Sequence, residues 1–203
     1  MAFEIKKSQM TRKNFNSYKD GLDLRFLRQF CLEHGTLKTM EKGEVLEKAG
    51  EPARWVAYVK EGYFKYMTHN ATEGRDYCVG FALTDEFVAD FPYCLHGYSS
   101  RVTIEAGMPS VVCICDGQEL QQLFTSSNRM TQRKMDILEN LFIMVYDRLV
   151  DYRRYTPAER YQQLVDRCPQ IIQQLPLTDI ASFLNITPTY LSVIRKKMML
   201  DKE

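Results

Sequence analysis

The chain has 203 residues, of which 45% are hydrophobic and 26% charged, the usual composition of a globular protein. This length can bury a core within one large domain or two small ones. The formal net charge is only +1, so any surface that binds nucleic acid has to be concentrated in one part of the chain. No apolar run approaches the roughly 20 residues of a membrane span, and the polar N-terminal segment lacks the apolar stretch of a secretory signal. We therefore expect a cytoplasmic protein with no membrane partner, whose six cysteines remain thiols.

Residues 1–20 are polar apart from isolated aromatic residues, and we expect a loosely held arm. A helix is predicted at 22–34, ended by Gly35. From Met40 to Cys115, short runs rich in Val, Tyr, Phe and Cys are separated by turn-forming residues, which predicts strands. Several short strands at this spacing predict a jelly-roll barrel or sandwich, in a domain over 21–127. The expected strands are 45–46, 55–59, 63–68, 77–83, 100–106 and 111–115.

Beyond residue 117 the apolar periodicity becomes helical. A short helix is predicted at 118–124 and a long one at 128–155, with Asn128 as its N-cap. Apolar side chains of the long helix recur in steps of three and four, a heptad pattern that predicts a dimerisation helix. The same stripe could instead pack against the chain's own barrel. The expected dimer residues are Met135, Leu138, Phe142, Val145, Leu149 and Tyr152.

A separate C-terminal domain is expected over 156–203. Pro157 disfavours helical geometry at the residue before it, so the chain should bend at Thr156. Thr156 can then cap a new helix that has Pro157 at its first position and Glu159 at its third.

Residues 177–194 have the pattern of a helix-turn-helix. The first helix is predicted to open at Thr178, and Asn185 lies where the chain must turn, because asparagine tolerates a positive φ. Thr187 caps the second helix and Pro188 begins it. A plain helical hairpin with a solvated basic end is the alternative. The apolar and small residues that would join the two helices are Leu177, Ile180, Ala181, Leu184, Ile186, Leu191 and Ile194.

The outward face of the second helix combines short polar side chains with cations. A recognition helix needs the former for base edges and the latter for phosphates. We therefore predict a DNA-binding surface formed by Thr178, Thr187, Thr189, Tyr190, Ser192, Val193, Arg195, Lys196 and Lys197.

Catalytic and metal-binding patterns are missing from the sequence. It has no nucleophile elbow, glycine-rich phosphate loop or paired metal motif. Cys113 and Cys115 share a strand face, but structural metal sites usually have four ligands, so we expect core thiols. His96 is expected to be a polar loop residue rather than a haem ligand. We therefore expect no enzyme, no catalytic residue and no metal site.

A strand-rich barrel, a long heptad helix and a helix-turn-helix follow each other along the chain, and this order resembles the Crp–Fnr family of bacterial transcription regulators. The resemblance covers about 22–199. It rests on 40–62, which looks like the family's opening strands, on 87–91, which looks like its phosphate-binding turn, and on 178–197, which looks like its DNA-reading helices. It implies an α+β fold with a cyclic-nucleotide-binding-like jelly roll. It also implies a homodimer that binds double-stranded DNA, a small effector in the barrel, and RNA polymerase as a further candidate partner.

The effector pocket departs from the family pattern. The family typically has a Glu for the ribose hydroxyl and an Arg for the cyclic phosphate, whereas this chain has Asp90 and Ser100 at those positions. Arg101 comes one place late, which in a strand turns its side chain to the other face. We therefore expect an unidentified small molecule rather than cyclic AMP, or no ligand. A solvated charge pair of Asp90 with Arg101 is an open alternative. The predicted effector residues are Phe87, Ala89, Asp90, Ser99, Ser100, Arg101 and Thr103.

The DNA-reading helix also departs from the family. Val193 stands where the family often has an Arg that pairs with guanine, and Val193 could touch a thymine methyl instead. Few residues follow Met199, so we expect a reduced domain without the usual wing. The alternative to a DNA-binding regulator is a ligand-binding or scaffold protein with a vestigial helix-turn-helix.

Overall fold

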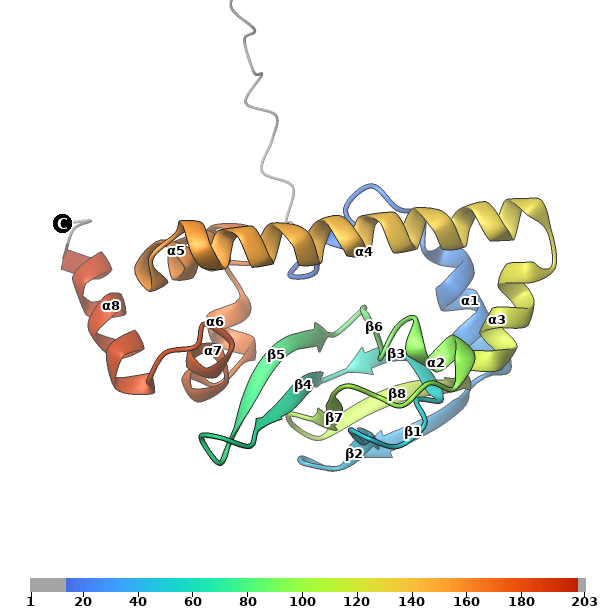
Figure 1. The fold of residues 1–203 in the computed structure, drawn as a ribbon, viewed down its shortest axis with the longest axis horizontal. Coiled ribbons are helices and arrows are strands. Elements are labelled where there is room, and N and C mark those ends of the chain that lie inside the picture. The colour runs from blue at the N-terminus through green and yellow to red at the C-terminus, as the bar shows by residue number, and fades with distance from the viewer. Residues whose placement is uncertain (1–13, 201–203) are drawn as a thin grey trace, which may run out of the picture.

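The computed structural model describes residues 14–200, and Figure 1 shows a strand-rich half joined to a helical half by one long helix. Two four-stranded antiparallel sheets have the strand orders β1-β8-β3-β6 and β2-β7-β4-β5. The strands are β1 Thr36–Met40, β2 Val45–Glu47, β3 Trp55–Glu61, β4 Tyr63–Asn70, β5 Arg75–Leu83, β6 Phe87–Ala89, β7 Thr103–Ala106 and β8 Ser110–Asp116. The helices are η1 Ser17–Lys19, α1 Arg25–His34, α2 Tyr93–His96, α3 Gly117–Thr125, α4 Asn128–Arg154, α5 Pro157–Arg167, α6 Ile171–Gln174, α7 Leu177–Phe183 and α8 Pro188–Leu200.

The two sheets enclose one hydrophobic core, to which both contribute. Val59, Val88 and Val112 come from one sheet, Phe64 and Ile104 from the other, and all five are fully buried. Strand β7 alternates between buried and partly exposed residues, as a strand with one face on a core does. The predicted α+β fold, with its strand-rich barrel, long helix and helical end, is confirmed.

Two strands were missed by the sequence patterns, and one was predicted too long. Strand β1 lies at a sheet edge beside β8, and four of its five residues are exposed, so it carries no apolar alternation. Strand β6 has only three residues, which pair with β3. The predicted strand at 100–106 starts at Thr103, because Ser100 and Arg101 form a turn held by the Asp90 carboxylate.

The helix ends show which local signals were sufficient. The Thr156 cap is confirmed as a capping box: the Glu159 N–H donates to Thr156 Oγ1, and the Thr156 N–H donates to Glu159 Oε2. The N-cap of α4 is Ser127, not Asn128, because the Ser127 hydroxyl accepts the Met130 N–H. Helix α7 begins at Leu177, one residue before the predicted Thr178. Its N-cap is Pro176, whose side chain cannot accept a capping hydrogen bond.

The described end of the predicted N-terminal arm is packed rather than loose, and residues 1–13 lie outside the described part. Phe15 is 4% exposed and Tyr18 is 8% exposed. The Asn16 side chain is buried and donates to the Phe81 carbonyl at 2.8 Å. The apolar burial of these two aromatic rings outweighs the polar character of their neighbours.

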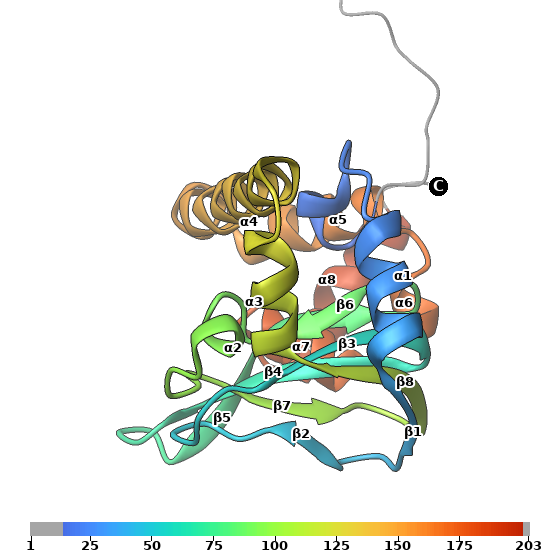
Figure 2. The ribbon, with the colours of Figure 1, turned by 90° about the vertical axis from the view of Figure 1, so that its right-hand side faces the viewer.

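Helices cover one side of the barrel, and α4 runs past it to carry the helical head, α5 to α8 (Figures 1 and 2). A second core cluster joins the barrel to its helical cover, with Leu27 of α1, Val56 of β3, Leu120 of α3 and Ile137 of α4. None of the helices in residues 14–200 is long and apolar enough to span a membrane.

A third cluster joins the barrel to the head. The Phe15 ring meets Phe81 of β5 at 5.6 Å and Phe183 of α7 at 5.5 Å between centroids, both edge to face. The guanidinium of Arg148 on α4 lies 5.0 Å from the Phe15 centroid. Phe15 therefore contacts the barrel, the long helix and the head at once.

We expect Phe15→Ala to lower the free energy of unfolding by about 3–5 kcal/mol, because it removes a buried ring that three elements share. Urea unfolding followed by circular dichroism measures this. Leu37→Ala, at a side chain that is 59% exposed, is the control and should change stability by less than about 0.5 kcal/mol. A loss below about 1 kcal/mol for Phe15→Ala would show that the contact is dispensable.

Candidate functional site

Helices α7 and α8 form a helix-turn-helix with the predicted turn. Asn185 has a φ of +55°, which places it in the left-handed region expected of it. The Ile186 N–H donates to the Ala181 carbonyl at 3.0 Å and closes the corner. Ile180, Ala181 and Leu191 are fully buried, so the two helices pack through the apolar residues that the sequence pattern selected.

The start of α8 is fixed by its cap. The Thr187 hydroxyl accepts the Tyr190 N–H at 3.1 Å, and Pro188 is the first helical residue. Val193 is 58% exposed and Tyr190 is 47% exposed. The Ser192 hydroxyl donates to the Pro188 carbonyl, one turn earlier, at 3.0 Å. The exposed residues among the predicted DNA-binding set are Thr178, Thr187, Thr189, Tyr190, Ser192, Val193, Lys196 and Lys197.

Arg195 differs from the other predicted cations on this helix. Its side chain is half-buried and lies beside Tyr161 of α5. Burial raises the pKa of Tyr161, and the neighbouring Arg195 charge opposes that rise. Lys196 and Lys197 are exposed, and α8 contains no acidic residue. The two lysines are therefore the cations that α8 presents to solvent.

The head is held on the barrel by polar contacts of α7. The Tyr63 hydroxyl donates to Asp179 Oδ2 at 3.1 Å, and Lys65 Nζ lies 3.6 Å from Asp179 Oδ1. The Cys78 N–H of β5 donates to the Ser182 hydroxyl at 2.9 Å. Burial is the main reason that the pKa of Tyr63 is raised well above its usual value, and Asp179 adds to it. The tyrosine stays a neutral donor to Asp179.

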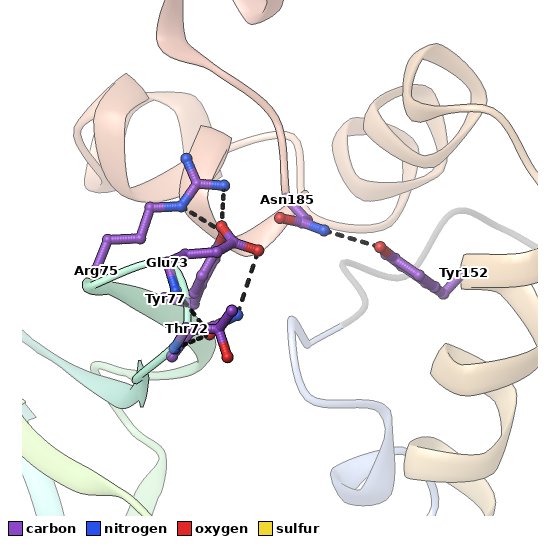
Figure 3. A network of polar contacts seen from close by, with 7 residues as sticks. Thr72, Glu73, Arg75, Tyr77, Tyr152 and Asn185 are labelled. Carbon is purple, nitrogen blue, oxygen red and sulfur yellow. Dashed lines mark hydrogen bonds and ion pairs between the residues drawn. The ribbon is translucent and has the colours of Figure 1, made fainter.

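The turn of the helix-turn-helix is tied to the end of the long helix. Figure 3 shows the Asn185 amide donating to the Tyr152 hydroxyl, at 2.8 Å. Across from this contact lies the β4–β5 hairpin, where Arg75 forms an ion pair with Glu73. A groove of about 800 Å³ is lined by residues of the hairpin, α4, α5 and the turn. The head thus contacts the barrel along α7 and the long helix at its turn.

The outer face of α4 carries the predicted dimer residues. Met135, Phe142, Val145, Leu149 and Tyr152 are 43–70% exposed, and Leu138 is half-buried. The exposed Phe142 ring stacks on Tyr146 of the next turn, with centroids 6.1 Å apart. A contiguous apolar surface of this kind on a helix is typical of an interaction face.

The inner face of the same helix packs on the barrel. Ile137, Leu141, Met144 and Arg148 follow each other in steps of four, three and four, so they share one face. Ile137 is 5% exposed and Met144 is 7% exposed. The alternative that the helix packs on its own barrel therefore applies to this inner stripe. The predicted stripe is mostly exposed, but Val145 also lines the cavity below α4, and Leu149 and Tyr152 line the groove beside the head.

A cavity of about 240 Å³ lies between this inner face and the barrel. Phe87, Ala89 and Asp90 of the predicted effector residues line it. The other four, Ser99, Ser100, Arg101 and Thr103, do not. Asp90 Oδ2 accepts the Ser100 hydroxyl at 2.8 Å and the Arg101 backbone N–H at 2.9 Å. One oxygen of the Asp90 carboxylate therefore stabilises the turn at Ser100 and Arg101.

The Arg101 side chain is exposed, and among the ion pairs of residues 14–200 none joins it to Asp90. The open alternative of a charge pair at the barrel rim is thus not what the structure shows. Arg101 contacts Asp90 through its backbone instead.

Sequence reasoning missed most of the cavity. Tyr66, Phe91 and Phe124 line it, and so does Arg148. Of these four residues, only Arg148 could have been singled out from the sequence, because it is a charged residue on an otherwise apolar helix face. The others come from separate elements that only the folded barrel brings together.

The cysteines and histidines show no metal-binding arrangement. All six cysteines are buried and free. The Cys113 thiol donates to the Cys31 carbonyl at 2.8 Å, as a core thiol can. His96 is an exposed residue at the end of α2. Across the described part of the chain, no three metal-ligating side chains come together.

No protein-family model matches this chain, and no curated protein matches it in sequence. Solved structures match it in fold. FixK2 from Bradyrhizobium japonicum gives a TM-score of 0.73 at 17% identity, over 83% of this chain and 86% of that one. The c-di-GMP-responsive global regulator CLP from Xanthomonas campestris gives 0.59 at 15%, over 89% and 93%. A protein described as a transcriptional regulator of the Crp/Fnr family, from Eubacterium rectale, gives 0.63 at 13%, over 93% and 89%. At these low identities the structural matches establish the fold alone. The chain has the fold of the Crp–Fnr transcription regulators.

Proposed function

We propose that the chain is a bacterial transcription regulator, not an enzyme, that binds double-stranded DNA as a homodimer and responds to a small molecule in its barrel. The observation that carries this proposal is the exposed face of α8. It combines polar residues and Val193 near the start with two lysines near the end, on a helix-turn-helix whose core is complete.

The two ends of this face suit different parts of the duplex. Thr187 and Thr189 at the N-terminal end are short enough to approach base edges in the major groove. Lys196 and Lys197 suit phosphates, which supply affinity but little sequence information. The overall charge of +1 is compatible with this, because α8 itself carries cations and no acidic residue.

The outer stripe of α4 supports a homodimer. One recognition helix alone binds weakly, whereas two related by a twofold axis can read two half-sites. Phe142 is 70% exposed and Leu149 is 62% exposed on a 27-residue helix. Burying these side chains against a second copy would remove the two most exposed large apolar residues of α4 from water.

We expect the double variant Lys196→Ala/Lys197→Ala to weaken DNA binding and to reduce its salt dependence. Each lost phosphate contact reduces the magnitude of the slope of log affinity against log salt by about one. A dimer loses two contacts per protomer, so its slope should fall by about four. Fluorescence anisotropy with DNA selected by the protein from a random pool measures both quantities.

The matched control is Lys42→Ala/Lys60→Ala, which removes the same charge from exposed positions of the barrel. It should leave the slope within about one unit of the wild type. Equal slopes for the two double variants would remove α8 as the DNA-binding face. Failure to enrich any sequence from the random pool would favour the ligand-binding or scaffold alternative.

Val193→Ala should change selectivity without changing the salt slope. A methyl contact to thymine reads one base pair and neutralises no phosphate. Selection of DNA by the variant should therefore yield a site with relaxed preference at one position per half-site. An unchanged preference at every position would show that Val193 does not read the DNA.

For the dimer, we expect Phe142→Asp to produce monomers, because a charge at the centre of the apolar stripe would have to be buried. Sedimentation equilibrium distinguishes the two states. Met108→Asp, at a side chain that is 43% exposed on the barrel, is the control and should stay dimeric. A Phe142→Asp protein that remains fully dimeric would place the interface elsewhere.

A further inference from the structure

The cavity between the barrel and α4 is mostly apolar, yet a half-buried cation lines it. Arg148 of the inner α4 stripe lines it, together with Asn16, Tyr66 and Asp90 among the polar residues. We propose that this cavity binds a small organic carboxylate with an apolar body, and that the Arg148 guanidinium binds the carboxylate. This inference rests on the proposed function only in that the cavity would be the effector site.

Arg148 is incompletely paired. Its Nη2 donates to Asn16 Oδ1 at 3.0 Å, and none of the ion pairs described for residues 14–200 includes it. Asn16 in turn donates to Glu86 Oε2 at 2.7 Å, so an amide separates the guanidinium from that acid. A guanidinium has five N–H donors, and a buried charge is stabilised most by an anion that takes two of them.

Burial lowers the pKa of Arg148 to about 10, and the nearby Glu86 opposes this. The folded pKa still lies well above neutral pH, so the side chain remains charged under ordinary conditions. Arg148 is therefore a cation shared by this cavity and the groove beside the head, because it lines both.

A second donor lies in the same cavity. The Tyr66 hydroxyl accepts the Ala89 N–H at 3.2 Å, which leaves its own proton free to donate. Burial raises the pKa of Tyr66 well above its usual value, so the proton stays on the oxygen. Asp90 lines the same cavity and would repel an anion beside it. The carboxylate of a ligand is thus assigned to the Arg148 end.

The remaining lining selects the body of the ligand. Phe87, Phe91 and Phe124 contribute aromatic rings, and Leu141 and Val102 contribute aliphatic surface. The volume of about 240 Å³ is below the roughly 300–1,000 Å³ of pockets for drug-sized molecules. A single ring with a short acidic side chain matches this volume better than a cyclic nucleotide or a dinucleotide.

Arg148 also gives the cavity a route to the head. Its guanidinium lies 5.7 Å from the centroid of Phe183 on α7, in addition to its contact with Phe15. A carboxylate that binds the N–H edge of Arg148 would also fix the orientation of the guanidinium that lies beside these two rings. Binding of a ligand in the cavity would therefore change a contact made by α7 of the helix-turn-helix.

The test is calorimetry on the full chain, with benzoate, phenylacetate and 3-phenylpropionate as probes. Each acid is compared with its neutral amide, and cyclic AMP is included as the larger anion. We expect at least one acid to bind once per protomer, about ten-fold or more tightly than its amide. Arg148→Gln should weaken that binding about ten-fold or more, and Arg148→Lys should restore part of it. Arg101→Gln is the control and should bind like the wild type, because Arg101 is exposed and does not line the cavity.

Three results would overturn the proposal: no binding of any of the three acids, equal binding of an acid and its amide, or tighter binding of cyclic AMP. Equal binding by wild type and a folded Arg148→Gln protein would also overturn it. If Arg148→Gln does not fold, the comparison of acid with amide on the wild type still decides. Calorimetry uses no DNA, so it tests this inference separately from the proposed function. A chain that binds the acid but no DNA would support the inference and contradict the proposed DNA-binding function. A chain that binds DNA but none of the acids would support the proposed function and contradict the inference.

Discussion

Packing of the inner face of α4 on the barrel determines where the other parts of the molecule can lie. Ile137 and Met144 are nearly fully buried in that contact, and the helix then continues past the barrel to the head. Because the inner stripe makes this contact, the outer apolar stripe around Phe142 is left exposed to water. The same packing also closes the cavity, because Leu141 and Met144 form one of its walls.

Arg148 connects the three functional parts of this arrangement. It lies on the long helix, lines the cavity, and places its guanidinium beside Phe15 of the arm and Phe183 of the head. A buried guanidinium is costly unless it is paired, so its surroundings respond to any anion that reaches it. One side chain would therefore link the proposed ligand site to the position of the helix-turn-helix.

Local signals in the sequence predicted the helical half well. The capping box at Thr156, the left-handed turn at Asn185 and the two helices around it depend on neighbouring residues, so short patterns were sufficient. Strands β1 and β6 could not be predicted, because one is exposed at an edge and the other has three residues. The cavity could not be predicted either, since Tyr66 and Arg148 meet only through the tertiary fold. The sequence placed only Phe87, Ala89 and Asp90 at this site.

The central claim is that the outer stripe of α4 pairs two copies and so presents two α8 helices to one duplex. Hydroxyl-radical footprinting on DNA selected by the protein tests this most directly. Two α8 helices related by a twofold axis should protect two symmetric patches on one face of the duplex, with centres about 10–10.5 base pairs apart or a multiple of this spacing. A single protected patch, or patches without twofold symmetry, would contradict the account.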